Sequence, residues 1–73
     1  MRVRVGAKYV YNPVLFDVSY RDKIDANPGD VVTVVNLPGA PKANTMGMCY
    51  IAKGGEFAGM VMTNSLTPAR GRS

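Results

Sequence analysis

The sequence predicts an all-β (mainly β) fold, a small antiparallel barrel of about five strands. Strand-length apolar runs recur along the 73 residues, with Gly, Pro and Asn between them, as in small barrels and sandwiches. The clearest signal is the segment from Gly47 to Leu66, where two runs of β-favouring residues flank Gly54-Gly55, a turn typical of β-hairpins. No stretch has the apolar period of an amphipathic helix.

Two strands are predicted in the N-terminal part of the chain. Arg2–Val5 alternates basic residues with valine, and the strand continues through Lys8–Tyr11 after a bulge or bend at Gly6-Ala7. Asn12-Pro13 ends it. The second predicted strand covers residues 14–20 and places one apolar set on a single face: Val14, Phe16 and Val18. Residues 21–27 are polar and predicted to be irregular.

Three further strands are predicted after a turn at Asn27-Pro28-Gly29-Asp30, where Pro and Gly occupy the positions that a tight turn favours. They cover residues 31–36, 48–51 and 57–62. A loop over residues 37–44 precedes the hairpin, whose connection is residues 53–56, and a short helical turn is expected near residues 63–66. We expect one domain over residues 1–67 and a mobile basic tail over residues 68–73.

The side-chain inventory disfavours catalysis and metal binding. Histidine is absent and Cys49 is the one cysteine, which excludes the commonest general base and the usual four-ligand zinc sites. We interpret Asp22, Asp25 and Asp30 as turn residues, and Cys49 as a small buried core residue. Gly54-Gly55 is interpreted as a hairpin turn, because no helix follows it to bind phosphate. The sequence therefore predicts a protein that is not an enzyme, with no catalytic residue, cofactor or metal.

The same inventory suggests a compartment. A lone cysteine forms no intramolecular disulfide, which is typical of a reducing compartment. No apolar run follows the first residues as in a signal peptide, and the longest apolar stretch, residues 31–35, is far below the roughly 20 residues of a membrane helix. We therefore expect a cytoplasmic protein that makes no membrane contact. We also expect it to be a monomer.

Positive charge lies mainly at the two ends of a chain whose net charge is +4. This distribution suggests an acidic partner, either nucleic acid or an acidic protein surface, and solubility is the alternative reading. Tyrosines beside the N-terminal bases suit base stacking or protein contact, unless they pack inward from a solvated strand. The candidate partner-binding residues are Arg2, Arg4, Lys8, Tyr9, Tyr11, Val14, Phe16, Lys42, Lys53, Arg70 and Arg72.

Apolar residues outside the clear strand patterns leave alternatives. The run from Val14 to Phe16 is expected in the core, with an apolar docking patch or an edge strand as the alternatives. The methionines of the hairpin region are expected to fill the core, although methionine also adapts to irregular partners. These are Met46, Met48, Met60 and Met62. On this interpretation the hairpin, with Cys49 and Phe57, is the scaffold, and residues 2–16 bind the partner.

Two segments resemble barrels of the Src-homology-3 and KOW type. Asn27-Pro28-Gly29-Asp30 followed by residues 31–35 resembles the opening of a strand in such barrels, and residues 59–66 resemble their end, where a strand enters a short helical turn. The chain lacks tryptophan, and the acidic loop and paired tyrosines of proline-peptide binders are not evident. The resemblance therefore implies the fold and not recognition of proline-rich peptides.

The length, the basic ends, the N-terminal MRVRVGAKYVY and the lack of a catalytic set resemble a family of small phage-encoded regulators of bacterial RNA polymerase, the Xanthomonas-phage antitermination and host-transcription-shutoff proteins. The resemblance implies binding to the N-terminal region of the polymerase β′ subunit near the RNA exit channel, displacement of sigma and suppression of intrinsic termination. It also implies residence in the host bacterial cytoplasm. The alternatives are a stand-alone nucleic-acid-binding module, which contacts an RNA or DNA backbone directly, and a self-associating structural protein.

Overall fold

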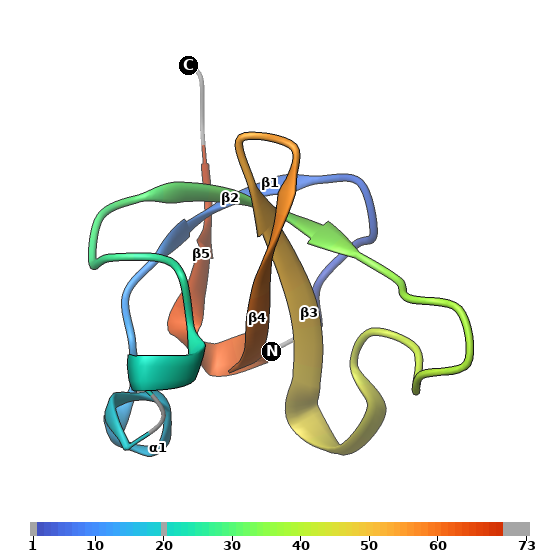
Figure 1. Cartoon of the computed structure of the whole chain (residues 1–73), viewed down its shortest axis with the longest axis horizontal. Helices are drawn as coiled ribbons and strands as arrows, with labels where there is room; N and C mark the ends of the chain where they lie inside the picture. Colours follow the sequence, from blue (N-terminus) through green and yellow to red (C-terminus); the bar gives the residue numbers. More distant parts are fainter. Residues whose placement is uncertain (1, 20, 70–73) are drawn as a thin grey trace.

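The computed structural model describes residues 2–19 and 21–69 as one antiparallel five-stranded sheet with a single short helix (Figure 1). The prediction of a mainly β fold with about five strands is confirmed. The strands are β1 (Lys8–Tyr11), β2 (Val31–Val35), β3 (Met48–Lys53), β4 (Glu56–Met62) and β5 (Leu66–Pro68), in the spatial order β4-β3-β2-β1-β5. The helical elements are α1 (Leu15–Val18) and the 3₁₀ turns η1 (Arg21–Lys23), η2 (Thr45–Gly47) and η3 (Thr63–Ser65).

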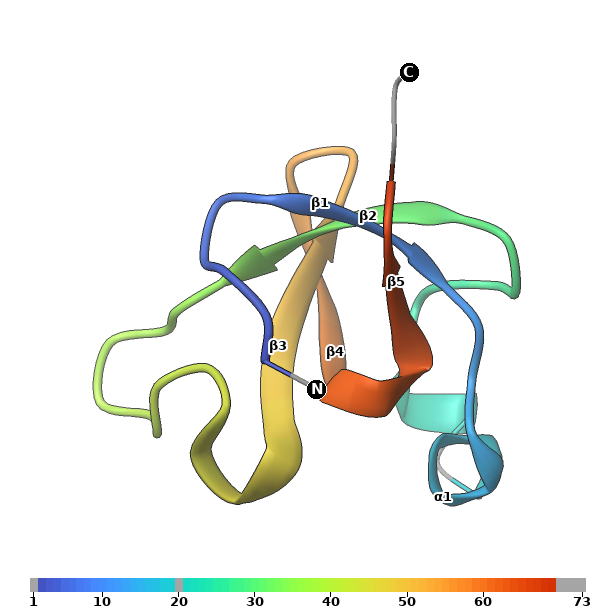
Figure 2. The ribbon, with the colours of Figure 1, turned by 180° about the vertical axis from the view of Figure 1, so that it is seen from behind.

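The sheet is strongly bent but is not a closed barrel, which corrects the closed architecture predicted from the sequence. Figures 1 and 2 show β1 and β2 running crosswise to β3, β4 and β5. In the part of the chain that the structure describes, β4 and β5 form the two edges and do not pair with each other. The outer edge of β4 is instead occupied by the segment between β1 and β2, because the Asp25 N–H donates to the Ala58 carbonyl over 2.6 Å.

The concave side of the sheet holds the core. Alternate residues of β2 and β3 supply its centre, with side chains that are almost completely buried: Val32, Val34, Cys49 and Ile51. Val61 and Leu66 close it from β4 and β5. The predicted burial of Cys49 is confirmed, because 2% of the residue remains exposed. No described helix is long and apolar enough to cross a membrane.

The bend predicted at Gly6-Ala7 is a β-bulge. The Gly6 N–H donates to the Val34 carbonyl over 2.8 Å, and the Val34 N–H donates to the Ala7 carbonyl over 3.1 Å, so two residues lie opposite one. Gly6 has a φ of +89°, which a residue with a Cβ adopts only with strain. The regular alternation predicted for residues 2–5 is wrong at Val5, which is 51% exposed, because the turn before the bulge changes the side that each residue faces.

The strand predicted over residues 14–20 is wrong, because α1 lies within this range instead. A strand would have buried the apolar set at positions 14, 16 and 18, yet Phe16 and Val18 are 48% and 43% exposed and Asp17 is buried. The carboxylate of Asp17 accepts hydrogen bonds from the Ser65 hydroxyl and from the Met62 N–H. A one-turn helix is therefore selected by a tertiary polar contact, against the β propensity of its residues.

The remaining turns follow the prediction closely. In the turn at residues 27–30, the Asp30 N–H donates to the Asn27 carbonyl over 3.0 Å and Gly29 has a φ of +91°. The hairpin turn is Gly54-Gly55, with φ values of +61° and +83°, so β3 and β4 extend to Lys53 and Glu56, beyond their predicted ends. The helical turn expected near residues 63–66 is confirmed as η3.

The predicted mobile tail begins too early in the chain. Thr67 and Pro68 belong to β5, which pairs with β1, and the Ala69 N–H donates to the Lys8 carbonyl over 3.2 Å. Burial of Leu66 anchors this short strand. The rest of the predicted tail, residues 70–73, lies outside the described residues.

Candidate functional site

The predicted N-terminal basic cluster is exposed but divided. Arg2, Arg4 and Lys8 all face solvent. They were expected on one face of a continuous strand, and the bulge at Gly6-Ala7 breaks that strand between Arg4 and Lys8. Arg70 and Arg72, the other predicted basic contacts, lie outside the described residues.

The prediction that Tyr9 and Tyr11 contact a partner is wrong, because both residues are buried, at 5% and 2% exposure. The Tyr9 hydroxyl accepts a hydrogen bond from the Arg4 N–H over 2.8 Å, which holds the N-terminal segment against the sheet. The inward-packing alternative for these tyrosines describes the structure.

The two predicted lysine contacts have different surroundings. Lys53 forms an ion pair with Asp30, with 2.7 Å between Nζ and Oδ2, so it joins the hairpin turn to the start of β2. The hydrogen bond from Lys53, and then the one from the Asn27 N–H, hold the pKa of the Asp30 carboxyl below its ordinary value. Lys42 is exposed and lines a small notch beside β3.

The apolar segment after Pro13 lies largely at the surface, not in the core as predicted. Leu15 is 86% exposed, Phe16 is 48% exposed and Val14 is half-buried. The Val14 N–H donates to the Ser65 hydroxyl oxygen over 3.0 Å, so this segment is tied to η3 by its backbone. The docking-patch alternative fits Leu15 and Phe16 better than the core assignment.

A second apolar surface lies on the hairpin, which the sequence analysis assigned to the scaffold. Three cross-strand pairs occupy the outer face of β3 and β4, opposite the core residues: Met48–Met62, Tyr50–Met60 and Ala52–Phe57. We call these six residues the methionine face. Phe57 is 54% exposed and Met60 41% exposed, so the prediction that Phe57 and the hairpin methionines fill the core is wrong.

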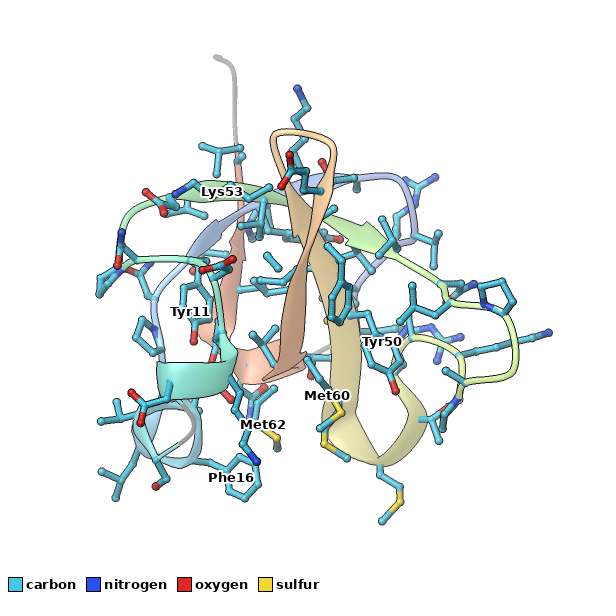
Figure 3. The ribbon with its side chains drawn as sticks, viewed as in Figure 1. Tyr11, Phe16, Tyr50, Lys53, Met60 and Met62 are labelled. Atoms are coloured by element: carbon cyan, nitrogen blue, oxygen red, sulfur yellow. The ribbon has the colours of Figure 1, made fainter. Side chains whose placement is uncertain are left out.

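Two features order the methionine face. The rings of Tyr50 and Phe57 lie 6.0 Å apart between centroids, tilted by 44°, within the range of favourable aromatic contacts. Figure 3 shows the labelled side chains of Met62, Met60 and Tyr50 in sequence across the hairpin, with Phe16 of α1 next along the row. The face therefore combines fixed rings with adaptable thioethers, which suits contact with a protein partner.

A notch of about 50 Å³ lies at the end of the methionine face toward η2. Its described lining is mostly apolar and includes Met46, Met48, Tyr50 and Met60, and Lys42 is the only charged residue among the described lining residues. Cofactors and drug-sized ligands occupy pockets of roughly 300–1,000 Å³. The notch therefore has room for about one aliphatic side chain.

The backbone beside the notch is held in an uncommon conformation. Asn44 and Met46 have φ values of +74° and +55°, and Met46 is 83% exposed. A left-handed residue with a Cβ costs roughly 1–2 kcal/mol. Two hydrogen bonds between the Asn44 carboxamide and the backbone of Val3, over 2.7 and 2.9 Å, hold this loop in place.

A buried polar cluster supports the face beside Met62, the cross-strand partner of Met48. Asp17 joins α1 to the Met62 N–H of β4 and to the Ser65 hydroxyl of η3, and both Asp17 and Ser65 are about 99% buried. Burial, and then the negative charge of Asp17, raise the pKa of the Cys49 thiol to about 11. Cys49 is therefore a protonated core residue near neutral pH and is poorly suited to be a nucleophile.

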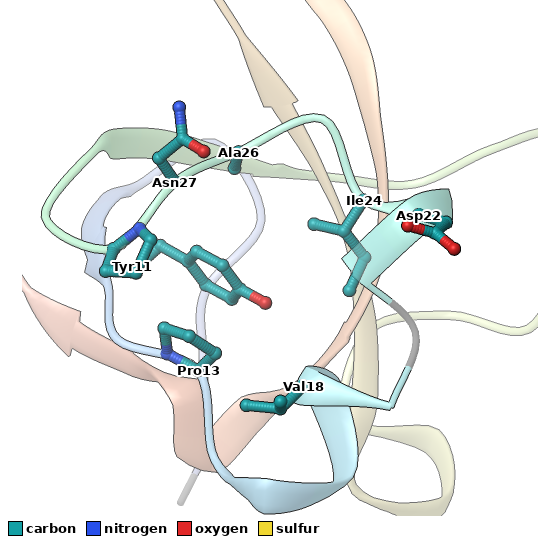
Figure 4. A pocket seen from close by; sticks show the side chains of 8 residues that line it. Tyr11, Pro13, Val18, Asp22, Ile24, Ala26 and Asn27 are labelled. Carbon is teal, nitrogen blue, oxygen red and sulfur yellow. The ribbon is translucent and has the colours of Figure 1, made fainter.

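A larger hollow of about 490 Å³ lies between the end of β1, α1 and the loop over residues 22–28. Figure 4 shows the Tyr11 ring projecting into it between Pro13 and Ile24. Among the described residues that line it, Asp22 is the only carboxylate, so they supply no paired acid and base. The described residues also contain no group of three potential ligands placed to hold a metal ion.

Sequence reasoning missed the methionine face for a specific reason. Both faces of β3 and β4 are apolar, so alternation could not indicate which face is buried. The available signal was residue type. Most small and β-branched side chains of β3 and β4 point toward the core, whereas the methionine and aromatic side chains between them lie on the outer face. Comparison of the chain with protein-family models, with curated proteins and with solved structures found no match.

Proposed function

We propose that this protein is a non-enzymatic regulator of bacterial RNA polymerase that binds the polymerase through the methionine face. The observation that carries the proposal is the row of three apolar cross-strand pairs at the surface of the hairpin. Contiguous exposed apolar surface rimmed by polar residues is a mark of protein-binding sites. The sequence resemblance to phage-encoded polymerase regulators suggests which protein is bound and places it in the bacterial cytoplasm.

The proposed mechanism is occlusion without chemistry. The methionine face docks on the polymerase, in the β′ N-terminal region by resemblance, while Arg2, Arg4 and Lys8 lie free to face acidic protein or nucleic acid near the RNA exit channel. A bound domain there inhibits initiation and suppresses termination. The proposed fold relationship is to Src-homology-3-type domains. Pairing of β1 with both β2 and β5, and the 3₁₀ turn before β5, support this connectivity in an open sheet.

The test is capture of purified bacterial RNA polymerase by the immobilised protein, followed by readthrough at an intrinsic terminator. Met60→Lys places a charge in the centre of the methionine face and should weaken capture by about tenfold or more. Thr67→Lys adds the same charge on exposed β5 and should leave capture unchanged. Failure of the unmodified protein to bind polymerase, or equal capture by the two variants, contradicts the proposal.

A second candidate function is direct binding of RNA or DNA, which the exposure of Arg2, Arg4 and Lys8 favours. It predicts binding to nucleic acid without polymerase, with affinity that falls steeply as salt increases. The double variant Arg2→Glu/Arg4→Glu should then abolish binding while the fold is retained. If polymerase is captured and isolated nucleic acid is not bound at low salt, this candidate is excluded.

A further inference from the structure

We propose that the notch beside Lys42 recognises an acidic segment of the protein partner: an aliphatic side chain enters the notch, and a neighbouring carboxylate pairs with Lys42. This inference rests on the proposed function, since it specifies the partner chemistry of the same face. The pairing with Lys42 would allow the face to distinguish an acidic partner segment from other apolar segments, which exposed apolar surface alone does not do.

The first argument is the shape and lining of the notch. Met46, Met48 and Met60 approach it from η2, β3 and β4, and the other described apolar residues of its wall are Pro41, Cys49 and Tyr50. Thioether side chains adjust to an inserted aliphatic group with little strain. The volume of about 50 Å³ limits the occupant to a single side chain, as in an anchor residue of a protein interface.

The second argument is charge. Lys42 is exposed at the notch, whereas the described carboxylates lie elsewhere: Asp17 of α1 is buried, and Asp30 is paired with Lys53. Asp22 and Asp25 line hollows along the loop over residues 22–28, and Glu56 begins β4 at the hairpin turn. A partner carboxylate at the notch therefore meets a cation without a described acid beside it, whereas a basic partner would be repelled.

The third argument is the conformation of η2. Met46 is 83% exposed on a left-handed backbone, an arrangement that the Asn44–Val3 hydrogen bonds maintain. Strained backbone that surrounding contacts hold in place is characteristic of binding sites. Here the strain sets Met46 at the wall of the notch, where an inserted side chain would cover it.

Other occupants fit less well. A second copy of this chain carries the same net charge of +4, and two methionine faces in symmetric contact would bring two Lys42 side chains into one interface. A nucleic-acid backbone needs several cations, and Lys42 is the only one among the described residues lining the notch. An acidic protein segment satisfies both the apolar wall and the single cation.

The test uses the full chain labelled with ¹³C at the methionine ε-methyl groups and three synthetic peptides: acetyl-Leu-Glu-Glu-amide, acetyl-Leu-Gln-Gln-amide and acetyl-Leu-Lys-Lys-amide. The Glu peptide should shift the Met46, Met48 and Met60 methyl signals saturably, with Kd in the millimolar range expected for so small a ligand. The Gln peptide should bind about threefold or more weakly, and the Lys peptide more weakly still.

Charge reversal provides the decisive variant. Lys42→Glu should reverse the order so that the Lys peptide binds best, whereas Lys23→Glu, the same charge change at an exposed position of η1 and outside the lining of the notch, should leave the order unchanged. Equal shifts with all three peptides, no saturable shift at these methyl groups, or an unchanged order in Lys42→Glu would each overturn the inference.

Polymerase capture separates this inference from the proposed function. If the unmodified protein captures polymerase and Lys42→Glu captures it equally well, the inference about the notch fails and the proposed function stands. If the unmodified protein captures no polymerase, the proposed function fails, while the peptide order still decides the chemistry of the notch. Capture that is weaker by about threefold to tenfold in Lys42→Glu, but not in Lys23→Glu, supports both.

Discussion

The carboxamide of Asn44 pairs with Val3 as a neighbouring strand would. Its Oδ1 accepts the Val3 N–H over 2.7 Å and its Nδ2 donates to the Val3 carbonyl over 2.9 Å. Val3 is buried, so both of its backbone groups need partners that the sheet does not supply. One side chain therefore joins the N-terminal segment to the loop that carries Met46.

Replacement of Asn44 tests how much its two hydrogen bonds to Val3 and its left-handed backbone affect stability. Asn44→Ala removes both hydrogen bonds and forces alanine into a left-handed conformation, so the free energy of unfolding should fall by about 2–4 kcal/mol. Asn44→Gly also removes the hydrogen bonds but accepts the φ of +74° without strain, so it should lose about 1–2 kcal/mol less. Urea denaturation of both variants measures the difference, and equal losses would show that the left-handed backbone contributes nothing.

Asp17 should be the most sensitive carboxylate of the described residues. Asp17→Ala leaves the Met62 N–H and the Ser65 hydroxyl without their acceptor in a buried site, which should cost about 2–5 kcal/mol. Exposed Asp22 is the matched control, and Asp22→Ala should change the free energy of unfolding by less than about 0.5 kcal/mol. Urea denaturation monitored by circular dichroism gives both values. Similar losses in the two variants would exclude the structural role assigned to the cluster.

The raised pKa of Cys49 predicts a loss of stability at alkaline pH. The thiol pKa is about 11 in the folded protein against an ordinary value of 9.0, so the unfolded chain releases its proton first as pH rises. The thiol therefore makes its full contribution to the free energy of unfolding below pH 9, and this contribution declines between about pH 9 and 11. Comparison of the free energies of unfolding of the unmodified protein and Cys49→Ala across this window isolates it. A constant difference between the two proteins would contradict the assignment.

Gly59 should be intolerant of any side chain. A Cβ there would lie 2.9 Å from the Lys23 carbonyl oxygen and 3.2 Å from the Ile24 Cα, on a backbone with a φ of +127°. Gly59→Ala should therefore separate the η1 loop from β4 and cost about 2–4 kcal/mol. Gly39→Ala is the control, since Gly39 also has a positive φ, +76°, but a Cβ added there would meet no described atom within 4 Å. This variant should lower the free energy of unfolding by about 1 kcal/mol. Equal melting temperatures for the two variants would contradict the predicted clash.

Local chemistry explains which elements were predictable. Gly54-Gly55 and Asn27-Pro28-Gly29-Asp30 specify turns by backbone preference alone, so the hairpin and the start of β2 follow from the sequence. The helix at Leu15–Val18 does not, because the contact that selects it joins Asp17 to Ser65, 48 residues away. For the same reason β5 was missed, since three residues become a strand only when β1 pairs with them.

The sequence by itself determined a mainly β domain, its hairpin and turns, and an excess of positive charge. Only the tertiary structure decided that the outer edge of β4 bonds to Asp17 and Asp25 and does not pair with β5. It also decided that the side chains of Tyr9 and Tyr11 are buried, whereas those of Phe57 and Met60 are exposed. The physical reason is that alternation separates the two faces of a strand but does not say which face meets the core. When both faces are apolar, the bend of the whole sheet makes that choice.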